Sequence, residues 1–99
     1  MVHHPPADLG MDICDHGQRV GSPAVHQFAV DNQPLIGCSG HIHESPYMHG
    51  GCWFAQVDKT IWLQPGQIDF ELHYVTLEIA GDFSINSIRH SIFGESPAL

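Results

Sequence analysis

Two histidines stand one residue apart in the stretch CSGHIHESP, residues 38–46, and this spacing raises the question of metal binding. Neutral imidazole is the commonest metal ligand among side chains. In an extended backbone, residues i and i+2 point to the same side, so His41 and His43 can aim both rings into one space. Two metal ions about 3.5–4 Å apart could each take one nitrogen. A polar strand end with solvent-exposed rings has the same pattern. Other residues of the chain are therefore needed to distinguish a metal-binding pair from an exposed strand end.

A second histidine pair stands in HHPP, residues 3–6, and supplies that context. Pro5 and Pro6 restrict this segment to extended conformations, which positions a ring with little loss of entropy on binding. Three histidines from these two segments could then fill half of a dinuclear site.

Several other polar residues could belong to the metal site or could simply be exposed to solvent. Glu44 follows His43 directly and could orient a ligand ring as an acceptor, or be an exposed loop carboxylate. His49 lies beside two glycines and could face the same cleft. The remaining polar candidates are expected to be solvated: loop residues Asp12, Asp15 and His16, and surface rings His26, His73 and His90.

The elements that must position these residues begin with a long loop over residues 1–21 and a helix over 23–32. Ser22 is placed as the N-cap and Pro23 as the first helical residue. Val25, Phe28 and Ala29 recur as an apolar stripe at helical spacing. The helix is expected to end at Asn32, and Pro34 prevents its return.

The rest of the chain has the pattern of β-strands. PLIGCS (34–39) predicts a buried strand that ends where the histidine pair begins. Residues 52–57 and 60–65 flank Asp58 and Lys59 as a hairpin, and 68–80 and 83–93 flank a two-residue turn at Gly81 and Asp82. Residues 1–99 are therefore predicted to form a single α+β domain, in which one helix and one strand precede a four-stranded antiparallel run. The large aromatic residues are expected in the core or an interface: Trp53, Phe54, Trp62 and Phe70.

Composition narrows the function classes. The formal charge is −8, with three Lys and Arg residues, so nucleic acid and anionic membranes are poor partners. A bound dication could still reverse the local field and attract an anion. The three cysteines form no C-x-x-C pair, which suits reduced thiols. With no secretory leader or apolar span in the sequence, a cytoplasmic location is expected.

The order HHPP, capped helix, strand ending in GHIHESP and hairpin ending in QPGQ resembles the C-terminal half of a calcineurin-like metallophosphoesterase. The resemblance covers nearly the whole chain. It implies half of a four-layer αββα fold and hydrolysis of phosphomono- or diesters by a dinuclear centre of Mn, Fe, Zn, Ni or Co. By the same resemblance His3 and His41 would bind the second metal and His43 the first, with His4 as a neighbour of the site. Gln64 stands where asparagine is usual, in a turn interpreted as structural.

The chain departs from that family because it lacks the segments that supply the other half of the metal site. Such enzymes take further ligands from an N-terminal half with D-x-H and G-N-H-D/E segments, neither of which occurs in these 99 residues. The resemblance then lacks a metal-bridging aspartate, an asparagine ligand and the histidine that assists the leaving group. Three imidazoles without carboxylates cannot fix two ions. The chain alone is therefore expected to be inactive or nearly so. Because half of the fold would leave a sheet face and an edge unpaired, we expect a homodimer or a complex with a separately encoded N-terminal half.

Two alternatives remain open. The first is a non-catalytic metal-binding or assembly module on the same scaffold. The second is a small cupin-like barrel, because H-x-H followed by a Pro-Gly hairpin also occurs there. That family needs a glutamate about four residues after the second histidine, where this chain has Tyr47 and Met48, and a helix over 23–32 fits a barrel poorly.

Overall fold

The computed structural model describes residues 1–97 and shows an α+β fold, as the sequence predicts. Within these residues one α-helix comes first and short strands follow it. The order is α1 (Pro23–Asn32), β1 (Ile36–Cys38), the 3-10 helix η1 (Ser45–Tyr47), β2 (Phe54–Val57), β3 (Thr60–Leu63), β4 (Val75–Ile79), β5 (Ile85–His90) and β6 (Gly94–Glu95).

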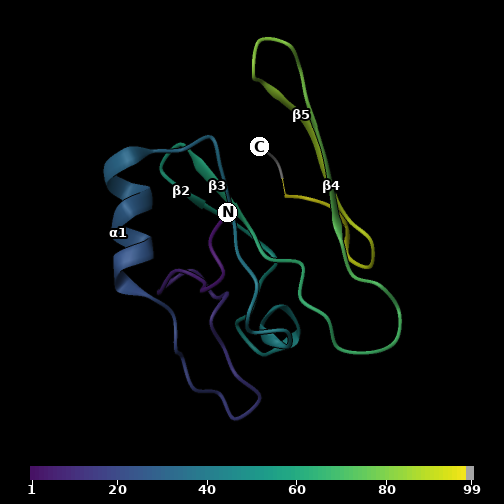
Figure 1. Cartoon of the computed structure of the whole chain (residues 1–99). Coiled ribbons are helices and arrows are strands. Elements are labelled where there is room, and N and C mark those ends of the chain that lie inside the picture. Colours follow the sequence, from purple (N-terminus) through teal and green to yellow (C-terminus); the bar gives the residue numbers. More distant parts are fainter. Residues whose placement is uncertain (98–99) are drawn as a thin grey trace.

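The described residues are arranged in three layers (Figure 1). The middle layer is a sheet of order β1-β3-β2, in which β1 runs parallel and β2 antiparallel to β3. Helix α1 and the N-terminal loop cover one face of this sheet. A second sheet, of order β4-β5-β6, covers the other face. The central strand β3 is therefore buried on both sides.

Alternation along β3 divides the core in two. Ile61 and Leu63 pack toward β4 and β5, where they meet Ile88 in one buried cluster. Trp62 points the opposite way and packs with Met11 and Ala29 under the helix. Opposite Trp62 the neighbouring strand has Gly37, where a Cβ atom would overlap the indole ring. The glycine thus lets β1 approach the largest side chain of the core.

Helix α1 begins and ends where the sequence predicts. The Ser22 hydroxyl accepts a hydrogen bond from the Val25 N–H at 3.1 Å, and Pro23 is the first helical residue. Gln33 ends the helix in the left-handed region at φ 47°. The predicted apolar stripe is wrong at Phe28, which is 55% exposed, because the sheet is contacted only by the narrow strip around Val25 and Ala29.

Ser22→Ala should lower the free energy of unfolding by about 1 kcal/mol, since the Val25 N–H loses its acceptor at the helix N-terminus. Urea unfolding followed by circular dichroism measures this loss. Ser22→Asp, which keeps an acceptor at the N-cap, should recover most of the lost stability. Equal destabilisation by both substitutions would show that the cap bond does not contribute.

The predicted four-stranded antiparallel run is wrong. The strands form two separate three-stranded sheets, and residues 68–74, predicted as part of a strand, lie outside β4. Gly66 has φ +73°, and the Gln67 amide donates to the carbonyls of Asp69 and Glu71, so this segment folds into a loop closed on itself. Phe70, expected in the core or an interface, is fully exposed on that loop and so is not part of the core.

The turn between β4 and β5 is one residue longer than predicted. The N–H of Ala80 donates to the carbonyl of Ser84, which leaves three residues in the loop. Phe83, the last of them, has φ +66°. The ladder shifts register between Glu78 and Ile79, and this bulge accommodates the extra residue.

Gln64, directly after β3, joins three parts of the chain. Its side chain is fully buried. The amide nitrogen donates to the carbonyls of Met11 at 2.6 Å and Ile42 at 3.1 Å, and the amide oxygen accepts from the Ser39 hydroxyl at 2.7 Å. The interpretation of the QPGQ turn as structural agrees with these bonds.

Two further expectations concern the whole chain. Cys14, Cys38 and Cys52 are all free thiols and half-buried. Within residues 1–97, the helices are too short and too polar for any of them to cross a bilayer.

Candidate functional site

The first residues of the chain lie along the edge of β1, and this placement brings His3 to His41. The Val2 N–H donates to the Cys38 carbonyl at 2.8 Å, and the Gly40 N–H donates to the His3 carbonyl at 3.1 Å. These bonds tie the HHPP segment to the residues that follow β1. The His3 Nε2 and His41 Nδ1 atoms are then 2.9 Å apart, with ring centroids separated by 4.7 Å.

His41 sits at the centre of a tight turn. The Ile42 N–H donates to the Gly40 carbonyl at 2.7 Å, and His41 has φ +66°. A three-residue turn with positive φ at its centre is the rare and strained form, and a left-handed residue other than glycine costs about 1–2 kcal/mol. Strain of this kind is held in place by the surrounding structure and clusters at functional sites.

The same turn removes the geometric basis expected for the H-x-H pair. Because the backbone at His41 is not extended, the two rings are not directed to one side by strand alternation. His43 is exposed, and its carbonyl accepts the Gln67 N–H at 2.8 Å. Within residues 1–97, no three His, Cys, Asp or Glu side chains are close enough to enclose a metal ion in this conformation.

His4 is the third imidazole at this place. Its Nε2 lies 2.7 Å from the Val20 carbonyl oxygen, which can only accept, so Nε2 carries the proton and Nδ1 keeps its lone pair. Its ring centroid is 5.3 Å from that of His41. We call His3, His4 and His41 the histidine cluster. A hydrogen bond from one ring nitrogen to a backbone carbonyl is the usual arrangement that orients histidines in metal sites.

The nitrogens of His3 and His41 fit two adjacent ligands of one ion. Ligands about 2.0–2.1 Å from an ion lie about 2.9 Å apart at a right angle and about 3.4 Å apart at the tetrahedral angle. The observed 2.9 Å is within reach of both arrangements. The same distance suits a hydrogen bond between two neutral rings, whose proton lies on the line between the two nitrogens. An ion bound to both nitrogens would lie off that line, so both rings would have to rotate to direct their lone pairs at it.

The other predicted site residues lie apart from this pair. Glu44 accepts the Asp15 N–H at 3.1 Å, a bond within the loops. His49 is exposed. Asp15 and His16 are also exposed, as expected, and His16 Nε2 lies 3.7 Å from a carboxylate oxygen of Asp15.

Asp12 was predicted to be solvated and is instead 2% exposed. One carboxylate oxygen accepts the Gly21 N–H at 2.8 Å, while the other is buried without a hydrogen-bond partner among the described residues. The Asp12 carbonyl also accepts the Val20 N–H at 3.1 Å. Through these two bonds Asp12 fixes the loop segment at Val20 and Gly21. The Val20 carbonyl in turn orients the His4 ring.

His73 and His90, predicted on the surface, are buried, and they fasten the loop after β3. His73 bonds through Nε2 to Asp69 at 3.1 Å and through Nδ1 to the Tyr47 hydroxyl. His90 Nε2 donates to the Pro65 carbonyl at 2.8 Å, while its Nδ1 accepts two backbone N–H groups. Strand alternation cannot predict the burial of these two histidines, because the alternation in one strand does not show which of its faces another part of the chain covers.

Tyr47 gives this network a pH dependence. Burial, with the charges of Asp69 and Glu71, raises the pKa of Tyr47 above its ordinary 10.0. The neutral phenol therefore stabilises the fold below about pH 10, and this contribution is lost as the pH rises through the raised pKa. Urea unfolding should show Tyr47→Phe less stable than the wild type at about pH 8, with a smaller difference at about pH 11. A difference that grows with pH would contradict this assignment.

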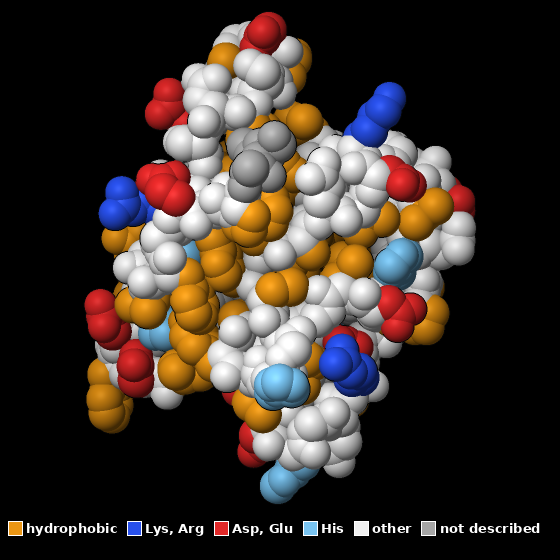
Figure 2. Space-filling view, turned by 180° about the vertical axis from the view of Figure 1, so that it is seen from behind, with side chains coloured by type: hydrophobic (Ala, Val, Ile, Leu, Met, Phe, Trp, Pro, Cys, Tyr) orange, Lys and Arg blue, Asp and Glu red, His pale blue; other side chains and the backbone are white. Residues whose placement is uncertain are grey.

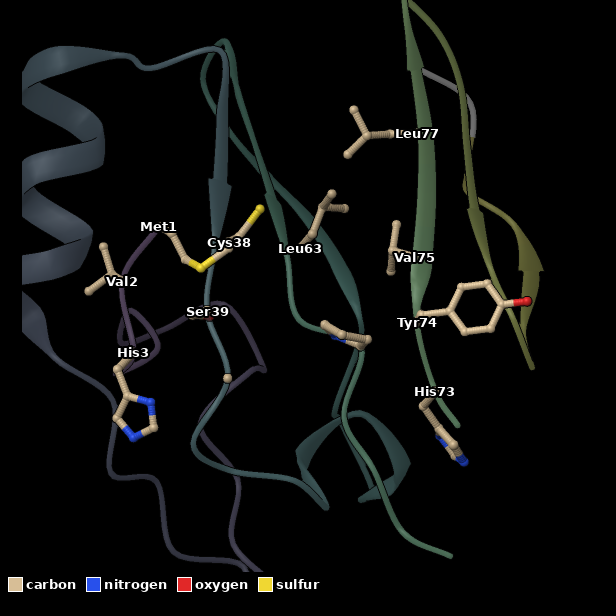
Figure 3. Close-up of a pocket in the computed structure, with 12 residues that line it drawn as sticks. Met1, Val2, His3, Cys38, Ser39, Leu63, His73, Tyr74, Val75 and Leu77 are labelled. Atoms are coloured by element: carbon tan, nitrogen blue, oxygen red, sulfur yellow. The ribbon is translucent and has the colours of Figure 1, made fainter. Parts of the chain in front are cut away.

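A cavity of about 650 Å³ begins beside His3 and runs between the two sheets. Its walls are largely apolar and come from the N-terminal segment, from β1 and β3, and from β4 (Figure 3). In this view Val75 and Leu77 point from β4 toward Leu63 of β3, and His3 lies at the opposite wall. His3 thus belongs both to the pair with His41 and to the wall of this cavity.

Comparisons of the chain with the sequence models of known families, with curated proteins and with solved structures gave no match.

Proposed function

We propose that the histidine cluster binds a divalent ion of the Mn, Fe, Zn, Ni or Co type and that the site serves metal-dependent hydrolysis of a phosphoester. The observation that carries this proposal is the 2.9 Å approach of His3 Nε2 and His41 Nδ1, from segments 38 residues apart. Such an ion would lower the pKa of a bound water and neutralise phosphoryl oxygens. In a chain of formal charge −8, it would also supply the positive field that attracts the phosphate.

Backbone hydrogen bonds within the chain fix the positions of the proposed ligands. The bonds of the N-terminal segment to β1 fix the backbone of His3, and the turn at Gly40 to Ile42 fixes that of His41. The Val20 carbonyl accepts from Nε2 of His4, which makes Nδ1 the lone-pair nitrogen of the neutral ring. His43 is proposed as a ligand of a second ion by the family resemblance. It would have to reach that ion from an exposed position after the turn.

A second candidate function is a non-catalytic metal-binding or assembly module. It is supported by the composition of the cluster, which contains imidazoles and no carboxylate. Two ions held for in-line displacement need bridging and charged ligands. We therefore propose that the chain by itself has little hydrolytic activity, and that activity requires a homodimer or a complementary N-terminal half.

Exposed hydrophobic side chains around the second sheet offer a surface for that association. Figure 2 shows hydrophobic and acidic side chains side by side over this part of the molecule. On the loop before β4 the apolar side chains alternate with acidic or buried ones, and the exposed members are Ile68, Phe70, Leu72 and Tyr74. Sedimentation equilibrium over a wide concentration range measures the self-association, and a monomer throughout would exclude the homodimer.

The experiment that tests the proposed function measures metal binding and hydrolysis on the same sample. Equilibrium dialysis against Zn²⁺, Mn²⁺ or Co²⁺ should load the wild type, and His3→Ala should reduce the loading. Hydrolysis of bis(p-nitrophenyl) phosphate above the rate of His3→Ala would support the phosphoesterase. Metal loading with equal rates would agree with the non-catalytic module and with a site that needs the complementary N-terminal half, and no loading difference would reject both functions.

A further inference from the structure

We propose that the cavity between the two sheets binds the apolar aryl or alkyl group of a phosphoester whose phosphoryl end lies at the histidine cluster. This inference rests on the proposed function for the phosphoryl end, while the apolar binding site stands on the cavity itself. A ligand-sized hollow of about 650 Å³ falls within the usual range for small-molecule sites.

The walls of the cavity have few polar groups left to recognise a ligand. The Ser39 hydroxyl already donates to Gln64 at 2.7 Å and accepts from the Trp62 indole N–H at 3.0 Å. Both ring nitrogens of His73 are bonded, to Tyr47 and Asp69. The ring of Tyr74 turns away from the cavity in Figure 3. A sugar or polar base placed here would lose its hydrogen bonds to water without replacement.

The backbone around the cavity is also paired. The N–H groups of Val2, Ser39 and Gly40 donate to the carbonyls of Cys38, Leu63 and His3, respectively. What remains exposed to the hollow is aliphatic or sulfur surface, contributed by Val2, Cys38, Leu63, Val75 and Leu77. Burial of apolar area is therefore the main interaction available to a ligand, at about 25 cal/mol per Å².

Charge places the phosphoryl group at one end. None of the three Lys and Arg residues lines the cavity, so no Lys or Arg side chain could pair with an anionic group inside it. His3 is both a wall residue and the partner of His41 at 2.9 Å. A metal ion on that pair would provide a strong positive charge at one end of the cavity. A monophosphate ester with one apolar group fits this polarity, with its phosphate outside and its apolar group inside.

The test compares 1-naphthol with 1-naphthyl phosphate as fluorescent probes. Without metal, 1-naphthol should bind the wild type, and Val75→Trp, which fills the cavity, should weaken binding at least tenfold. Thr76→Trp is the matched control, because Thr76 is exposed on the other face of β4, and it should change binding less than twofold. Absence of 1-naphthol binding to the wild type, or equal binding to Val75→Trp, would overturn the apolar site.

A measurement on the wild type keeps the test independent of how well Val75→Trp folds. On addition of 1-naphthol, the methyl resonances of Leu63, Val75 and Leu77 should shift in a ¹H–¹³C spectrum. Those of Val57, which does not line the cavity, should not. Shifts confined to other methyl groups would place the probe elsewhere and reject the proposal.

The phosphoryl end is tested with Zn²⁺ present. We expect 1-naphthyl phosphate to bind at least tenfold more tightly than 1-naphthol, and His3→Ala should abolish the difference. If Zn²⁺ binds the cluster and the phosphate gives no gain, the cavity is not a substrate site. If Zn²⁺ does not bind while 1-naphthol does, the proposed function fails and the apolar binding site remains.

Discussion

Replacing Gln64 with leucine is expected to lower the free energy of unfolding by about 3–5 kcal/mol, although leucine has a similar volume and is more apolar. The substitution leaves three buried groups without their partner: the carbonyls of Met11 and Ile42 and the hydroxyl of Ser39. Each unpaired buried group costs about 1–3 kcal/mol. Because small domains are stable by about 5–15 kcal/mol, this single change should bring the protein close to unfolding at room temperature.

Gln56→Leu is the matched control for that measurement. Gln56 lies on β2, is exposed, and donates one side-chain hydrogen bond to the Asp58 carbonyl. Its loss should change the free energy of unfolding by about 0.5 kcal/mol or less. Urea denaturation followed by tryptophan fluorescence compares the two variants directly, because Trp62 packs beside the Gln64 network. Similar stabilities of the two variants would mean that the buried amide does not hold the loop, the histidine segment and β3 together.

Replacing His41 with glycine should weaken the binding of Zn²⁺ or Co²⁺ at least about 100-fold, since loss of a residue that merely supports a ligand already costs about 10–100-fold. The substitution removes one of the two nitrogens that lie 2.9 Å apart. Glycine is chosen because it adopts the φ of +66° at this position readily, so the turn to Ile42 should form as before. Competition with a chromophoric chelator measures the affinity.

His16→Gly controls for unspecific binding in a chain with nine histidines. His16 is exposed and lies in the loop beside Gly17, where its ring nitrogen is 3.7 Å from Asp15. Its replacement should leave the high-affinity binding unchanged. An equal loss of affinity in both variants would show that metal binding is spread over surface imidazoles, and that the cluster has no special role.

Local signals in the sequence predict the elements well where they act through neighbouring residues. Ser22 and Pro23 place the start of α1, and the step at Asp58 and Lys59 places the hairpin of β2 and β3. The division into two sheets is not visible in such signals. It depends on the loop after β3, which Gln67 closes on itself through the carbonyls of Asp69 and Glu71. Residues 68–74 alternate like a strand and yet form no ladder.

In the candidate site, too, features set by neighbouring residues could be predicted, while features set by contacts between distant segments could not. The residue pattern pairs His41 with His43, and only the family resemblance joins His41 to His3. The structure brings His3 and His41 together through backbone bonds along β1. The turn at His41 could not be predicted, because a positive φ at histidine has no reliable sequence signal. The burial of His73 depends on partners from distant segments, which pattern and periodicity do not reveal. The metal-binding role of His43 stays a prediction.

The most direct measurement is a long-range ¹H–¹⁵N spectrum of the histidine rings during a Zn²⁺ titration of the wild-type chain. The account predicts that the Nε2 resonance of His3 and the Nδ1 resonance of His41 move together to metal-bound positions as the first equivalent is added. Their partner nitrogens should remain protonated. Shifts that leave either of these two nitrogens unchanged at saturation would contradict a metal ion at this pair, and with it the proposed chemistry.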